Sequence, residues 1–114
     1  MKSKGNIVFL GMMGSGKTSI GSLFSKKFKL DFYDTDQLIE KKLNTKISKI
    51  FQEKGEKFFR DFEEKITLQI LRNKNIVVAL GGGTFLNKKI RNEILKNHNS
   101  IWLDWDTEIL LRRI

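Results

Sequence analysis

Hydrophobic positions along the chain fall into short apolar runs, separated by longer stretches in which apolar residues recur every three or four positions. Four runs have the length of a strand, and each is followed directly by glycine or aspartate: Asn6–Leu10, Leu30–Tyr33, Ile76–Leu80 and Ile101–Leu103. A short apolar run bounded by turn residues is typical of a buried strand. The sequence therefore predicts four strands.

The stretches between these runs have the spacing of amphipathic helices. Helices are expected over Lys17–Phe28, from a cap at Thr35 or Asp36 to about Leu43, over most of Ile47–Arg72, over Asn87–Asn97, and from a cap at Asp106 or Thr107 onward. Gly55 is expected to divide the long stretch into two helices, because glycine disfavours a helix interior.

Strands that alternate with helices predict βαβ units and a parallel sheet between helical layers. The expected fold class is therefore α/β, with three layers in the order α/β/α. Ligands of such sheets bind beyond the carboxyl ends of the strands. Four segments follow predicted strands and should line that edge: Gly11–Thr18, Asp34–Asp36, Gly81–Gly83 and Asp104–Asp106.

Length and composition exclude several classes of protein. The 114 residues correspond to one small domain, 1–114, and 39% hydrophobic residues are too many for a disordered chain. No apolar run approaches the ~18 residues that span a bilayer. The chain has no cysteine, which excludes disulfides and thiolate metal sites. With no signal-like segment at the start, we expect a cytoplasmic protein.

The net charge of +9 raises the question of an anionic partner. The basic residues are spread along the chain singly and in pairs, which is typical of a solvated surface. The aromatic residues lie mostly on the helical stripes, whereas a nucleic-acid surface needs them exposed among clustered basic groups. We therefore expect neither a nucleic-acid nor a membrane partner. His98, between polar neighbours, is expected to be a solvated loop residue.

The segment between the first strand and the first helix matches the phosphate-binding pattern G-x-x-x-x-G-K-[ST]. Its residues are Gly11, Met12, Met13, Gly14, Ser15, Gly16, Lys17 and Thr18. Glycines bring backbone N–H groups close to phosphate oxygens, and the following helix presents its positive end. Lys17 would contact the β- and γ-phosphates and Thr18 would bind Mg²⁺. The motif predicts nucleotide binding without choosing among kinase, GTPase and ATPase.

Two further segments offer groups for a second substrate. Asp34 and Asp36 lie two residues apart after the second strand, where one could support Mg²⁺ and the other a substrate hydroxyl; the alternative is a helix cap. The third predicted strand ends without an acidic residue, so Asp34 is the candidate on the metal side. Gly81, Gly82 and Gly83 predict either a tight turn or a close approach of backbone to ligand.

Arg60 is a candidate for binding a carboxylate, because a guanidinium can hold one with two hydrogen bonds. Glu63 and Glu64 lie three and four residues further along the predicted helix, so that one of them can brace the arginine. The alternative is a surface ion pair.

Together these motifs resemble those of shikimate kinase in order and spacing over essentially the whole chain. The matching residues are Gly11–Thr18, Phe32–Asp36, Gly55 and Glu56, Phe59 and Arg60, Glu63 and Glu64, and Gly81–Gly83. The resemblance implies ATP-dependent phosphorylation of the shikimate 3-hydroxyl, on the route to chorismate and the aromatic amino acids. It also implies a parallel sheet of order 2-3-1-4-5, and we expect a monomer.

The resemblance assigns roles residue by residue. Lys17 would stabilise the transferring phosphoryl group, and Thr18 with Asp34 would hold Mg²⁺. Asp36 would bind the reacting hydroxyl and could act as its base. Arg60 would hold the shikimate carboxylate.

Three further implications concern the substrate ring, the adenine and the end of the chain. Gly81, Gly82 and Gly83 would pack against the substrate ring, and Arg113 matches an arginine near the adenine. Family members continue for roughly a third more, with an arginine-bearing lid, a fifth strand and a last helix, so we expect an incomplete C-terminus. Two alternatives stay open: another small-metabolite kinase of the gluconate-kinase type, and a nucleotide-binding remnant without turnover.

Overall fold

The computed structural model describes residues 5–11 and 17–103, with side chains for residues 5–10 and 20–102. The strands are β1 (Ile7–Gly11), β2 (Asp31–Asp34), β3 (Ile76–Ala79) and β4 (Asn99–Leu103). The helices are α1 (Lys17–Phe28), α2 (Thr35–Leu43), α3 (Ile47–Ile70) and α4 (Lys88–Asn97), and a short 3₁₀ turn, η1 (Thr84–Leu86), precedes α4. All four predicted strands are confirmed, with ends shifted by one or two residues.

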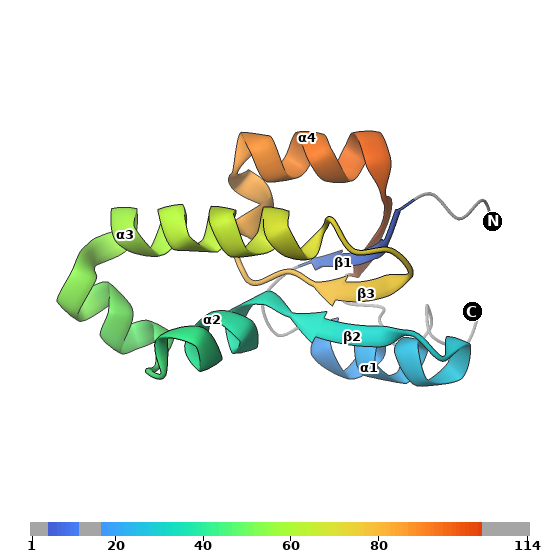
Figure 1. Cartoon of the computed structure of the whole chain (residues 1–114), viewed down its shortest axis with the longest axis horizontal. Helices are drawn as coiled ribbons and strands as arrows, with labels where there is room; N and C mark the ends of the chain where they lie inside the picture. Colours follow the sequence, from blue (N-terminus) through green and yellow to red (C-terminus); the bar gives the residue numbers. More distant parts are fainter. Residues whose placement is uncertain (1–4, 12–16, 104–114) are drawn as a thin grey trace.

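The strands form one parallel sheet in the order β2-β3-β1-β4. Helix α1 lies on one face, while α4 and the second half of α3 lie on the other, as Figure 1 shows. This confirms the three-layer α/β/α prediction for the described residues. The order agrees with the expected 2-3-1-4, and the helix expected from Asp106 or Thr107 lies outside the described residues.

Alternate residues of the central strands, β1 and β3, point into two hydrophobic cores on opposite faces of the sheet. Val8 and Val78 point into the core beneath α4, where Ile90 and Ile94 are fully buried. Phe9 and Val77 point to the other face, where Ile20 of α1 covers them. Both faces of β1 and β3 are therefore buried, as an α/β sheet requires.

A third core joins α2 to both halves of α3, where the arm extends from the sheet in Figure 1. Its buried residues are Ile39, Ile50, Phe59 and Ile66. Within α3, Gly55 has φ 89° and ψ 167°, a backbone conformation outside the helical region. The predicted break at Gly55 is therefore confirmed, and α3 consists of two helical halves.

His98 lies between α4 and β4, as expected for a loop residue, but the expectation that it is solvated was wrong, because its side chain is only 3% exposed. The backbone N–H of Asn6 donates to Nδ1 of the ring at 2.9 Å, and Nε2 lies 2.9 Å from a carboxylate oxygen of Glu93. The Asn6 side chain in turn donates to the carbonyls of Leu71 and Asn73. His98 therefore belongs to a polar cluster at the amino ends of β1 and β4.

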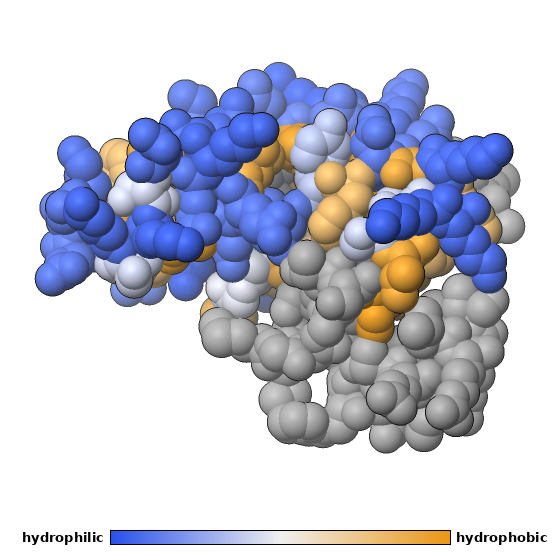
Figure 2. Space-filling model, turned by 90° about the horizontal axis from the view of Figure 1, so that it is seen from below, coloured by the Kyte–Doolittle hydropathy of each residue, from blue (hydrophilic) through white to orange (hydrophobic). Residues whose placement is uncertain are grey.

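Figure 2 shows the molecule from below the view of Figure 1, which is the side of α1. This surface is mostly hydrophilic over the arm, and hydrophobic side chains gather on the part of it that lies toward the sheet. A hollow of about 510 Å³ is apolar and lies at the amino ends of the strands, away from the predicted site. Its lining includes Ile7, Phe24, Phe28, Leu30 and Ile76. Within residues 5–11 and 17–103, no helix is long and apolar enough to cross a membrane.

Candidate active site

Asp34 ends β2 and is the N-cap of α2. Its backbone is extended, and its side chain accepts a hydrogen bond from the N–H of Gln37 at 3.1 Å. The prediction that Thr35 or Asp36 would cap this helix was therefore wrong by one residue, since both lie inside its first turn. All three residues are of types that favour N-caps, so the composition alone could not separate them.

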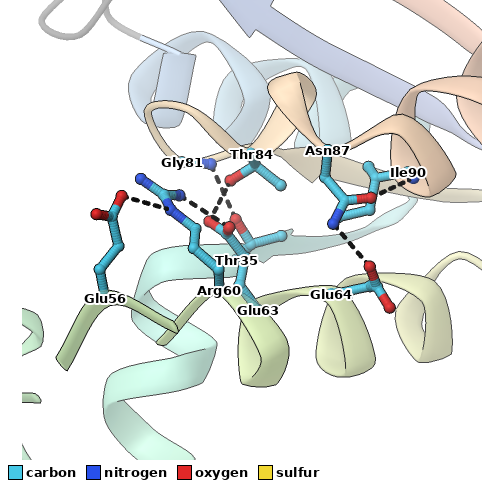
Figure 3. A network of polar contacts seen from close by, with 9 residues as sticks. All are labelled: Thr35, Glu56, Arg60, Glu63, Glu64, Gly81, Thr84, Asn87 and Ile90. Carbon is cyan, nitrogen blue, oxygen red and sulfur yellow. Dashed lines mark hydrogen bonds and ion pairs between the residues drawn. The ribbon is translucent and has the colours of Figure 1, made fainter. Parts of the chain in front are cut away.

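Thr35 connects α2 to the turn after β3. Its side chain is fully buried, and its hydroxyl accepts a hydrogen bond from the backbone N–H of Gly81 at 2.9 Å. Asp36 is half-buried next to it. The contact places the start of α2 and the triple glycine side by side at the carboxyl edge of the sheet (Figure 3).

The triple glycine approaches both predicted substrate residues. A β-carbon on Gly81 would overlap the Asp36 carboxylate, and one on Gly83 would lie 3.1 Å from Nη2 of Arg60. Gly83 also has a φ of 84°, in the left-handed region that favours glycine. The segment is thus a tight turn whose lack of side chains lets Asp36 and Arg60 pack against its backbone.

Arg60 is held by a buried carboxylate. Its Nη1 donates to Oε1 of Glu63 at 2.9 Å, and the Glu63 side chain is 1% exposed while that of Arg60 is 36% exposed. The ring of Phe59 lies 5.2 Å from the guanidinium carbon, and the exposed Glu56 lies 3.8 Å from Nε. The predicted brace is therefore Glu63, and the guanidinium keeps an accessible part toward solvent.

The neighbouring carboxylate, Glu64, has another role. It accepts a hydrogen bond from the side chain of Asn87 at 2.8 Å, while the Asn87 side-chain oxygen caps α4 through the N–H of Ile90 (Figure 3). The pair joins α3 to the start of α4 and does not contact Arg60 in any of the interactions recorded for the described residues. Glu64 therefore fixes the position of the helix, whereas Glu63 fixes the arginine.

The contacts of two site residues were not predicted: Thr35 was given only as a possible helix cap, and Thr84 was not singled out. The hydroxyl of Thr84 donates to Oε2 of Glu63 at 2.6 Å, and both threonine side chains are fully buried. Their partners are 46 and 21 residues away along the chain. No local pattern could identify these contacts, and the sequence signal nearest to Thr84 is the triple glycine that it follows.

The electrostatics around Arg60 are balanced locally. Lys57, one turn before Arg60, donates to Asp61 at 2.9 Å, and this hydrogen bond and the charge of Asp61 raise the pKa of Lys57 above its ordinary value. Both groups are exposed, so the pair adds little to stability. Among the polar interactions around Arg60, those of the buried Glu63 therefore contribute most to stability.

An apolar hollow of about 230 Å³ adjoins the triple glycine. It is lined by Leu10, Leu80, Gly81, Gly83, Phe85, Leu86 and Trp102. The rings of Phe85 and Trp102 meet edge to face, with 5.3 Å between their centroids. An apolar wall beside a cation and a carboxylate is the usual composition of a site for a small polar molecule.

The phosphate-binding segment is described only at its two ends. β1 ends at Gly11 and α1 begins at Lys17, so the predicted strand before the segment and the predicted helix after it are both present. Met12, Met13, Gly14, Ser15, Gly16 and Arg113 lie outside the described residues, and the side chains of Lys17 and Thr18 are not described. β3 lies between β2 and β1, which puts Asp34 about 10 Å from β1 at the same edge.

No group of three or more carboxylate, imidazole or thiol side chains that could hold a metal ion is found among residues 20–102. Mg²⁺ at phosphate-transfer sites needs only one or two protein oxygens, because substrate phosphates and water complete its coordination. Asp34, a hard oxygen donor at the carboxyl end of β2, fits that requirement.

Comparison with known proteins identifies the relatives of this chain. A shikimate kinase of Bacillus subtilis is 48% identical over 104 residues, covering 90% of this chain and 56% of the relative. The structure of a shikimate kinase from Acinetobacter baumannii in complex with shikimate superposes with a TM-score of 0.86 at 31% identity, over 96% of this chain and 62% of that one. A Sinorhizobium meliloti gluconokinase, at 17% identity and a TM-score of 0.59, shares the fold alone.

The relatives are longer than this chain, which spans between 51% and 66% of their length. The sequence model of the shikimate kinase family matches residues 13–114. That match includes Asp36, Arg60 and the triple glycine, the residues that the fold brings together at one edge of the sheet. By this match over most of its length, the chain belongs to the shikimate kinase family.

Proposed function

We propose that the protein transfers the γ-phosphoryl group of ATP to the 3-hydroxyl of shikimate, giving shikimate 3-phosphate and ADP. The observation that supports this most directly is the meeting of Asp36 and Arg60 at opposite ends of the triple-glycine turn. A carboxylate and a cation separated by side-chain-free backbone suit a small ring that has a hydroxyl on one side and a carboxylate on the other. The proposed setting is the cytoplasm, with residues 1–114 as a single P-loop kinase domain acting as a monomer on small molecules, without nucleic-acid or membrane partners.

At the substrate end of the site, the protein would act by holding shikimate in a fixed position. Arg60, held at Nη1 by Glu63, would bind the shikimate carboxylate with the rest of its guanidinium. Gly81, Gly82 and Gly83 would lie against the ring. Asp36 would accept the proton of the 3-hydroxyl. The hydroxyl oxygen would form a bond to the γ-phosphorus while the bond between that phosphorus and the ADP oxygen breaks.

The nucleotide end would use the phosphate-binding segment. Backbone N–H groups of residues 11–16 and the ammonium of Lys17 would neutralise the phosphates, and Arg113 would lie near the adenine. Thr18 and Asp34 would supply oxygen ligands to Mg²⁺, which contributes charge neutralisation of the phosphates when bound. Asp34 would do so while its Oδ1 accepts from Gln37, since a carboxylate has several lone pairs.

Shikimate-dependent release of ADP tests the proposal. In Arg60→Ala the KM for shikimate is expected to rise at least tenfold more than the KM for ATP, because only the carboxylate contact is lost. Lys57→Ala is the matched control, since it removes an exposed positive charge from the same helix three residues earlier. Equal losses in both variants, or ATP binding with no shikimate-dependent ADP, would contradict the proposal.

A second variant addresses the phosphate end. Lys17→Ala is expected to suppress turnover by at least about a thousandfold while the protein stays folded, because the transferring phosphoryl group loses its neutralising charge. Circular dichroism and thermal unfolding would establish that the fold is intact. Turnover at the wild-type rate in this variant would remove Lys17 from the catalytic machinery.

A further inference from the structure

Glu63 is an ionisable side chain in an almost fully buried position, and its two oxygens have separate partners. Oε1 accepts from Arg60 at 2.9 Å and Oε2 accepts from the Thr84 hydroxyl at 2.6 Å. Burying a carboxylate is costly unless its oxygens are hydrogen-bonded. The two contacts together meet that requirement and leave the carboxylate one orientation (Figure 3).

The Thr84 contact has the geometry of a strong hydrogen bond. An O–H···O⁻ separation of 2.5–2.7 Å is typical of charge-assisted bonds, which are about twice as strong as neutral ones. Thr84 has 0% exposure, and it begins η1 directly after Gly83, whose backbone packs on the guanidinium of Arg60. The same short segment therefore contacts Arg60 twice, through Gly83 directly and through Thr84 by way of Glu63.

We propose that Thr84 is a positioning residue for substrate binding, which orients Arg60 through Glu63. The hydroxyl holds Oε2, so that Oε1 stays aimed at Nη1, and the remaining guanidinium N–H groups face the substrate side in a fixed plane. This inference rests on the proposed function, because it assigns Arg60 to the shikimate carboxylate. It adds a residue that touches neither substrate nor nucleotide.

The matched variants are Thr84→Val, which replaces the hydroxyl by a methyl group of similar size, and Thr84→Ser, which keeps the hydroxyl. Glu64→Gln is the control, because Glu64 is the adjacent carboxylate on α3, contacts Asn87 and Lys89, and joins α3 to the start of α4 instead of to η1. Thr84→Ala serves as a second test if the valine does not fold, since it removes the hydroxyl without adding bulk.

Two readouts separate positioning from general stability. The first is the rotation rate about the Nε–Cζ bond of Arg60, measured by NMR of the guanidinium signals without any substrate. The second is the dissociation constant of shikimate measured by calorimetry. In Thr84→Val we expect the rotation to become several times faster and the dissociation constant to rise about threefold to tenfold. ATP affinity should stay within about twofold, and Thr84→Ser should restore both shikimate readouts.

The outcomes distinguish this inference from the proposed function. If the wild-type protein does not bind shikimate, the proposed function fails, while the rotation rates still decide whether Thr84 orients Arg60. The inference is overturned if Arg60 rotates at the same rate in wild type and Thr84→Val. It is also overturned if Glu64→Gln accelerates the rotation equally, or if shikimate binds wild type and Thr84→Val with the same affinity.

Discussion

Gly81 packs directly against the carboxylate of Asp36, so closely that a β-carbon at residue 81 would overlap both carboxylate oxygens. Gly81→Ala is therefore expected to displace Asp36 from the position in which it meets the substrate hydroxyl. A displacement of about 1 Å at a reacting group costs on the order of a hundredfold in rate. We expect a loss of this size in kcat for shikimate phosphorylation, with ATP binding retained. A kcat within twofold of wild type would show that Asp36 has no such role.

Gly83 and Gly55 form a natural pair for testing the approach of backbone to Arg60. Both have positive φ, 84° and 89°, so alanine at either position strains the backbone and destabilises the fold by about 1–3 kcal/mol. Only at Gly83 would the new β-carbon contact the guanidinium, whereas nothing lies within 4 Å at Gly55. Gly83→Ala should raise the KM for shikimate, and Gly55→Ala should not. Equal KM values in the two variants would contradict the contact.

Asp34 has an observed role as a helix cap and a proposed role at the metal, and two substitutions separate them. Asparagine is as good an N-cap as aspartate but a much weaker ligand of Mg²⁺. Asp34→Asn should keep thermal stability and raise the Mg²⁺ concentration needed for half-maximal activity. Asp34→Ala should in addition lower the free energy of unfolding by about 1 kcal/mol. Identical Mg²⁺ dependence in Asp34→Asn and wild type would leave Asp34 with the cap alone.

His98 links the start of β1 to the end of α4, and we expect its loss to weaken the fold. His98→Ala would leave the buried N–H of Asn6 without its acceptor, which costs about 1–3 kcal/mol. Urea unfolding followed by circular dichroism measures the change. Lys96→Ala, two residues earlier and exposed, is the control and should be neutral. A solvated His98 would give the same midpoint in both variants.

The features that could be predicted from the sequence are those determined by residues close together along the chain. The strands are apolar runs next to turn residues, and the break in α3 lies at Gly55 because only glycine adopts its φ of 89° and ψ of 167° without a large cost. Helical spacing limited the brace of Arg60 to Glu63 or Glu64, and the structure shows that it is Glu63. Each of these predictions depends on residues within one or two turns of one another.

The features that sequence missed have distant causes. His98 is buried because Asn6, 92 residues away, donates to its ring, whereas its sequence neighbours are all polar. Thr35 and Thr84 become parts of the site only when α2, α3 and the turn after β3 meet. The cap at Asp34 was one of several that the sequence allowed, since three consecutive residues were of suitable type. What distinguished them was the extended backbone of the strand that ends there.

The bend at Gly55 separates the arm from the half of α3 that bears Arg60. Glu63 and Glu64 join the second half of α3 to the segment after β3, whereas Ile50 of the first half packs with α2 in the third core. Phe59 and Ile66 of the second half belong to that same core. Across the bend, the centroid of the Phe51 ring lies 4.7 Å from that of Phe59 and 6.0 Å from the guanidinium carbon of Arg60. A change in the bend angle would therefore move an aromatic ring that packs beside the arginine. In mechanical terms, the kink couples the surroundings of Arg60 to the movements of the arm.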